Sequence, residues 1–112
     1  MKEKFKVQLL EEVDKFLNGL NEKARTKIIY NLRKAQIVND KELFKKLNDN
    51  VWEFRTLHNR TYYRLFAFWD KTSKTETLVI STHGIEKKTG KTPPKEIAKT
   101  ERIMKQYFAA KK

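Results

Sequence analysis

The stretch VWEFRTLHNRTYYRLFAFW, residues 51–69, constrains the fold of this chain more than any other part of the sequence. Apolar and polar residues alternate on both sides of an Asn-Arg pair, a pattern that predicts two β-strands joined by a tight turn. A loop of two residues, Asn59-Arg60, or of four, residues 58–61, places Arg55 directly opposite Arg64. A loop of odd length would shift the register and separate the two arginines.

The apolar spacing is helical before residue 50 and strand-like after it. The first part predicts a short strand over residues 5–9, helices over residues 10–20 and 21–36, and a third short helix with Asp40 as N-cap and Leu43, Phe44 and Leu47 as its apolar residues. The second part predicts strands at Val51–Leu57, Thr61–Trp69 and Thr77–Thr82, then a helix that begins near Pro93 with Thr92 as N-cap. The order of elements indicates an α+β fold.

Composition limits the classes of function. A chain of 112 residues without a visible linker is expected to form a single domain over residues 1–112. The formal net charge of +12 favours an anionic partner, most commonly nucleic acid. There are no cysteines and only two histidines, so we expect no metal and no cofactor. No apolar segment is long enough to cross a membrane, and we expect a cytoplasmic location.

The facing arginines need an explanation, because like charges across a strand pair destabilise a hairpin. Two guanidinium groups one strand apart can bracket a phosphate and stabilise the charge that builds on it during displacement. Glu53 would share their face and supply a local counter-charge, and Tyr62 would lie on the same face. The same pattern also suits a solvated strand face on which Glu53 and surface acids neutralise Arg55 and Arg64.

Other candidates follow the third predicted strand. His83 is expected to close that strand, and Lys87 and Lys88 follow closely enough to reach the same concavity. RNA cleavage by the 2′-hydroxyl needs a base, an acid and positive charge on the phosphorane, which these side chains can supply. The alternatives are a hydrogen-bonded histidine at a strand end and a solvated basic loop. Three tyrosines are candidates for stacking on a splayed base, namely Tyr62, Tyr63 and Tyr107.

Taken together, the segments VWEFR, YYRLFAFW and HGIEKKTGKTPPKEI, followed by a basic helix that reaches Gln106-Tyr107, resemble the HigB-like branch of the RelE/ParE toxin superfamily. The resemblance covers nearly the whole chain. It implies an α+β, RelE-like fold: a small twisted, mainly antiparallel sheet of about four strands, with the N-terminal helices packed on one face and a C-terminal helix.

The resemblance also implies a function. It predicts the toxin of a type II toxin–antitoxin system, which cleaves messenger RNA on the ribosome without metal and contacts 16S ribosomal RNA. A HigA-like antitoxin with a helix-turn-helix domain would neutralise it. The family's basic active-site positions correspond to Arg55, Arg64, Lys87 and Lys88, with His83 and Tyr107 as further members, and we expect RNA contacts from Arg60, Tyr62, Lys91 and Lys95.

Two other functions suit the same sequence. The ParE branch of the superfamily inhibits gyrase and has no nuclease activity, and a basic domain of this size can also be a non-catalytic nucleic-acid-binding module. Fold alone does not choose among them.

Overall fold

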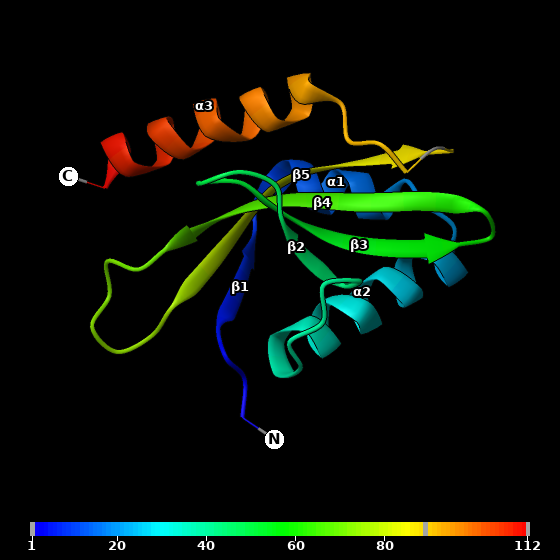
Figure 1. Cartoon of the computed structure of the whole chain (residues 1–112), viewed down its shortest axis with the longest axis horizontal. Coiled ribbons are helices and arrows are strands. Elements are labelled where there is room, and N and C mark those ends of the chain that lie inside the picture. The colour runs from blue at the N-terminus through cyan, green and yellow to red at the C-terminus, as the bar shows by residue number, and fades with distance from the viewer. Residues whose placement is uncertain (1, 89, 112) are drawn as a thin grey trace.

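The computed structural model describes residues 2–88 and 90–111 of the chain, and over these ranges it contains five strands and three helices (Figure 1). In chain order the elements are β1 (Lys6–Leu9), α1 (Glu11–Asn18), α2 (Glu22–Ile37), β2 (Phe44–Lys46), β3 (Trp52–His58), β4 (Thr61–Asp70), β5 (Leu78–Lys87) and α3 (Pro94–Ala110). The predicted α+β class is therefore correct.

The strands form one mixed sheet in the order β1-β5-β4-β3-β2. All neighbouring strands are antiparallel except β1, which runs parallel to β5. The sheet is thus mainly antiparallel, as expected, but it has five strands rather than about four. Figure 1 shows α3 on the opposite side of the sheet from α2, and the C-terminus lies at the end of α3 that is farthest from the β3–β4 turn.

The hairpin of β3 and β4 has the predicted register. Asn59 and Arg60 have φ values of 54° and 65°, so they form the two-residue turn that matches the twist of antiparallel strands. Arg55 is consequently paired with Arg64, and Glu53 with Phe66. Because side chains alternate along a strand, one face of the hairpin carries Glu53, Arg55 and Arg64, together with Tyr62.

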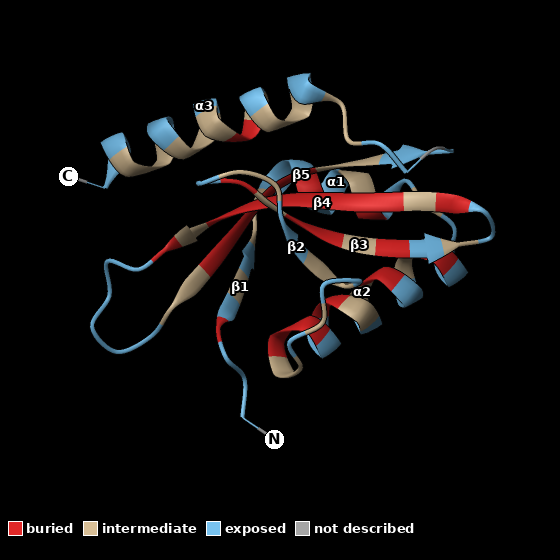
Figure 2. Cartoon of the chain, in the orientation of Figure 1, coloured by how far each residue is buried: buried red, intermediate tan, exposed pale blue. Residues whose placement is uncertain are grey.

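The opposite face of the sheet packs against α1 and α2 and forms the apolar core. The buried side chains of this core are Phe5, Val13, Leu17, Ala24, Ile28, Leu32, Ala35, Phe54, Tyr63, Leu65, Ala67 and Val79. Asn21 caps α2 by accepting a hydrogen bond from the backbone N–H of Ala24, at 2.9 Å. Figure 2 shows that burial is most continuous along β4, which has a neighbouring strand on each side and helices over both faces.

The predicted third helix is absent from the described residues, and a turn followed by β2 takes its place. Asp40 does cap this turn, because its side chain accepts from the backbone N–H of Glu42 at 2.9 Å. Phe44 then pairs with Phe54 across the strands, and their ring centroids lie 4.3 Å apart. Stacking on the aromatic residues of β3 outweighs the local helical spacing.

Two boundaries near the candidate site also differ from prediction. β5 continues to Lys87, so His83 lies inside the strand and does not close it. The N-cap of α3 is Pro93, and Thr92 makes no capping hydrogen bond to the helix. Instead, the Thr92 hydroxyl donates to Glu53, at 3.0 Å.

Gly84 allows the middle of β5 to lie close to α1. A Cβ atom at this position would lie 2.5 Å from Cδ2 of Phe16 and 2.8 Å from Cδ2 of Leu65. We therefore expect Gly84→Ala to lower the free energy of unfolding by about 1–3 kcal/mol, measured by urea denaturation. Gly19→Ala is the matched control, because a Cβ there meets only ordinary contacts at 3.6 Å. Equal stability of the two variants would contradict this account.

Candidate functional site

The face of the sheet opposite the apolar core carries the predicted basic residues. Arg55 and Arg64 lie side by side on β3 and β4, and Tyr62 and Lys87 pair with each other farther toward the turn. The segment after β5 returns over this face, because Arg64 donates to the carbonyl of Gly90. The structure therefore brings the two arginines, Tyr62 and Lys87 onto one face of the sheet.

Arg64 is buried in an ion pair. Its Nη1 donates to Oε2 of Glu53 at 2.6 Å, and both side chains are only 2% exposed. Oε1 of Glu53 accepts the Thr92 hydroxyl, while Nη2 of Arg64 donates to the Gly90 carbonyl. Residues 90–92 thus cover the pair, and the Nε of Arg64 has no hydrogen-bond partner among the described residues.

Arg55 lies beside the buried pair of Glu53 and Arg64 and is partly exposed to solvent. Its side chain is 24% exposed, and its Nε lies 3.6 Å from Oε2 of Glu53. Its Nη1 is 3.9 Å from the carboxylate of Glu42, a residue whose side chain is 85% exposed. These separations exceed those of good hydrogen bonds, so the guanidinium of Arg55 keeps donors for an incoming anion.

Tyr62 lies next to the arginines. The Cζ atom of Arg64 lies 5.6 Å from the centroid of the Tyr62 ring, which is within the range of a cation–π interaction. Tyr62 is half-buried, and Lys87, its pairing partner on β5, is exposed. This end of the face can therefore offer an aromatic ring and an exposed ammonium group to one ligand.

The two lysines after Glu86 diverge. Lys88 donates from Nζ to Oγ1 of Thr61, at 2.9 Å. Thr61 precedes Tyr62 in β4, so its side chain lies on the opposite face from Tyr62 and Lys87. Of these two lysines, Lys87 therefore lies on the same face as the arginines and Lys88 does not. The remaining predicted RNA contacts, Arg60, Lys91 and Lys95, are exposed.

His83 is buried and fully engaged. Its Nε2 lies 3.0 Å from Oε1 of Glu96, its Nδ1 lies 2.8 Å from the Thr82 hydroxyl, and its ring stacks on Phe66 at 5.0 Å. Burial lowers the pKa of His83, and the hydrogen bond that the ring donates to Glu96 only partly opposes this effect. A neutral ring that donates from Nε2 to the carboxylate must accept from Thr82 at Nδ1. His83 therefore ties α3 to β5 and offers no free nitrogen to a substrate.

Tyr107 lies at the other end of the sheet. Its hydroxyl donates to Oδ2 of Asp70 at 2.6 Å, and burial together with this hydrogen bond raises the pKa of Tyr107. Asp70 is six residues beyond Arg64 on β4, a separation of about 20 Å along a strand. The structure consequently does not bring Tyr107 together with the arginines.

Asp70 accepts hydrogen bonds from four donors, in a cluster that the sequence did not reveal. Thr72 donates from its backbone N–H and its hydroxyl, and Lys111 donates from Nζ at 2.9 Å, in addition to Tyr107. Burial by itself raises the pKa of Asp70, but these hydrogen bonds together hold it well below its usual value of 3.8. The cluster fastens the end of α3 to the end of β4.

The Asp70 cluster predicts a pH dependence of stability. Because the carboxyl pKa is lower in the folded state, the cluster stabilises the fold above about pH 4, and this contribution is lost as the pH falls below that value. Asp70→Asn should cost roughly 1–3 kcal/mol at pH 7 and clearly less at pH 3, measured by urea denaturation. Asp49→Asn, at an exposed position, is the control. A cost that does not change with pH would contradict this assignment.

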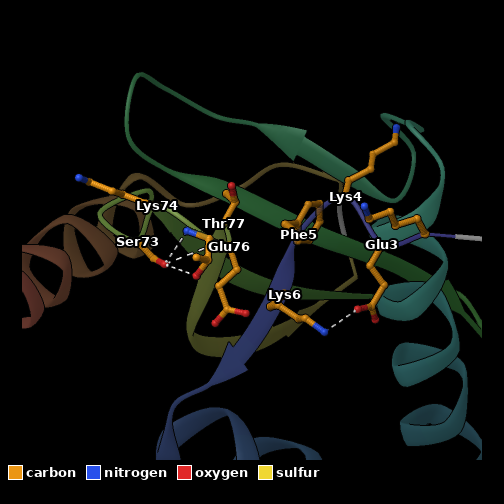
Figure 3. A pocket seen from close by; sticks show the side chains of 10 residues that line it. Glu3, Lys4, Phe5, Lys6, Ser73, Lys74, Glu76 and Thr77 are labelled. Carbon is orange, nitrogen blue, oxygen red and sulfur yellow. Dashed lines mark hydrogen bonds and ion pairs between the residues drawn. The ribbon is translucent and has the colours of Figure 1, made fainter.

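The best-formed hollows among the described residues are lined by neither Arg55 nor Arg64. One of about 400 Å³ separates the N-terminal segment from the loop between β4 and β5 (Figure 3). Glu3 pairs with Lys6 there at 3.2 Å, and Figure 3 shows Lys4 and Lys74 directed away from each other. The hollow therefore holds no convergent set of basic groups. Over residues 2–88 and 90–111 there is also no cluster of three potential metal ligands.

No helix in the described part of the chain is long and apolar enough to span a membrane.

No curated protein matches the chain. The family model of the phage-derived Gp49-like proteins (DUF891) matches residues 15–105, which include α2, all of β2 to β5, and most of α3. The Gp49-like proteins are a RelE/toxin-like family. The match covers most of the length of the chain and includes Glu53, Arg55 and Arg64. The chain therefore belongs to the phage-derived Gp49-like family.

Proposed function

We propose that this protein is the toxin of a type II toxin–antitoxin system and that it cleaves messenger RNA on the ribosome. The observation that carries the proposal is the pairing of Arg55 with Arg64 on a sheet face that also presents Tyr62 and Lys87. Membership of a RelE/toxin-like family and the net charge of +12 support it.

The proposed reaction is attack of the RNA 2′-hydroxyl on the adjacent phosphate. The 2′-hydroxyl gives its proton to water as a new bond forms between the 2′-oxygen and phosphorus. The bond to the 5′-oxygen breaks, the 5′-oxygen takes a proton from water and leaves as a hydroxyl, and a 2′,3′-cyclic phosphate remains. The guanidinium of Arg55 and the ammonium of Lys87 stabilise the negative charge of the phosphorane. Tyr62 offers a ring against which a nucleobase of the splayed message can stack.

The Gp49-like protein would be neutralised by a cognate antitoxin with a helix-turn-helix domain. Finding a small reading frame for such a protein beside this one would support the assignment. Co-expression of the two chains should then restore growth that expression of the toxin alone arrests.

The direct experiment incubates the purified protein with ribosomes programmed with a defined message and maps new message ends. We expect cuts in the ribosome-bound message and none in the same message without ribosomes. Intact message would overturn the proposal. Intact message together with supercoiling defects in expressing cells would instead assign the protein to gyrase inhibition, and RNA binding without any product would assign it to the non-catalytic nucleic-acid-binding proteins.

A further inference from the structure

We infer that Arg55 is the arginine that contacts the RNA phosphate, and that Arg64 is a positioning residue which Glu53 and Thr92 lock to the segment before α3. This inference rests on the proposed function and narrows its site. We call Glu53, Arg64, Gly90 and Thr92 the latch. It joins β3 and β4 to the segment that connects β5 with α3.

The carboxylate of Glu53 is fully used within the protein. Oε2 accepts from Arg64 at 2.6 Å and faces Arg55 at 3.6 Å, while Oε1 accepts from Thr92 at 3.0 Å. The carboxylate thus occupies the position between two guanidinium groups where a phosphate oxygen would bind. A phosphate that entered there would have to displace a charge-assisted hydrogen bond inside a buried site.

The two arginines differ in the donors that remain. Arg64 is 2% exposed, with Nη1 held by Glu53 and Nη2 held by the Gly90 carbonyl. Arg55 is 24% exposed, and its separations of 3.6 and 3.9 Å to two carboxylates are too long for strong hydrogen bonds. The Arg55 guanidinium can therefore turn toward an anion, whereas that of Arg64 cannot do so while the latch is closed.

The latch has a second consequence for the chain that follows β5. Residues 90–92 lie over Glu53 and Arg64, so the latch fixes the position of Lys91 and the start of α3 relative to Arg55. A message phosphate held by Arg55 would then meet Lys91 and Lys87 at set places. Thr92 contributes to this positioning through the single hydrogen bond that its hydroxyl donates to Glu53. Its role in the inference is therefore to hold the segment in place and not to bind RNA.

The first experiment measures the salt dependence of binding to a labelled single-stranded RNA with 2′-O-methyl groups, which cannot be cleaved by 2′-oxygen attack. Each phosphate contact from a cationic side chain adds about one to the slope of log Kd against log salt. We expect Arg55→Ala to lower this slope by about one. The charge-neutral double variant Glu53→Gln/Arg64→Gln should keep the wild-type slope, as should the matched control Arg102→Ala, an exposed arginine of α3.

The second experiment tests the latch without removing either member of the buried ion pair. Thr92→Val should increase the rate of tryptic cleavage after Lys88 and Lys91 several-fold and slow single-turnover cleavage on saturating ribosomes without weakening ribosome binding. Thr92→Ser restores the hydroxyl and should restore both rates. Thr26→Val, at an exposed threonine of α2, is the control and should change neither.

Several outcomes would overturn the inference. The assignment of the arginines fails if the slope of log Kd against log salt falls by about one in the double variant, or stays unchanged in Arg55→Ala. It also fails if the wild type does not bind the RNA. The latch is contradicted if Thr92→Val is as well protected from trypsin as the wild type. If the wild type shows the expected slopes and protection but leaves message on ribosomes intact, the proposed function fails while the assignment of Arg55 to phosphate and of Arg64 to the latch stands.

Discussion

Replacing Glu53 by alanine is expected to lower the free energy of unfolding by about 3–5 kcal/mol, because the guanidinium of Arg64 would remain buried without its counter-charge. The wild-type pair has a separation of 2.6 Å and almost no exposed side-chain surface. Urea denaturation at neutral pH provides the measurement. Glu42→Ala is the matched control, since Glu42 also faces an arginine but is 85% exposed, and its loss should cost less than about 1 kcal/mol.

A double variant separates the loss of a charge from the loss of packing. Glu53→Leu/Arg64→Met replaces the ion pair by apolar side chains, and buried pairs replaced in this way commonly lose little stability. We expect the double variant to be more stable than Glu53→Ala. If Glu53→Ala unfolds no more easily than Glu42→Ala, the pair is not buried in solution.

The second large effect concerns catalysis. Arg55→Ala should slow cleavage of ribosome-bound message by about 10²–10³-fold, as expected for the loss of one group that stabilises transition-state charge. Stability should change little, because Arg55 is partly exposed and its ion-pair contacts are long. Single-turnover rates on saturating ribosomes measure the effect. Arg102→Ala should cleave at the wild-type rate, and a similar rate for Arg55→Ala would exclude Arg55 from the site.

The register of the β3–β4 hairpin was predictable because two local rules act together. The two-residue turn fixes the pairing, and the alternation of side chains then places Glu53, Arg55 and Arg64 on one face. Nothing in the local sequence distinguishes which arginine is buried. That depends on Gly90 and Thr92, which the chain brings over the hairpin from beyond β5.

Long-range packing explains the other differences. The residues 83–87 look like a loop because they are polar and contain Gly84, yet the ten-residue β4 provides a partner along their whole length. Tyr107 follows the basic segment in sequence, but α3 has 17 residues and is about 25 Å long, so it carries the tyrosine away from the arginines. Local spacing encodes neither the extent of pairing between strands joined by a long loop nor the direction of a helix.

The parallel pairing of β1 with β5 has a consequence for synthesis. Lys6 pairs with Leu78, so β1 must wait until β5 has been translated before its backbone hydrogen bonds to that strand can form. Such distant pairing closes a long loop and slows folding. A nascent chain that has emerged only through β4 therefore has β1 without its partner strand, and the sheet is complete only after β5, which ends at Lys87, has left the exit tunnel.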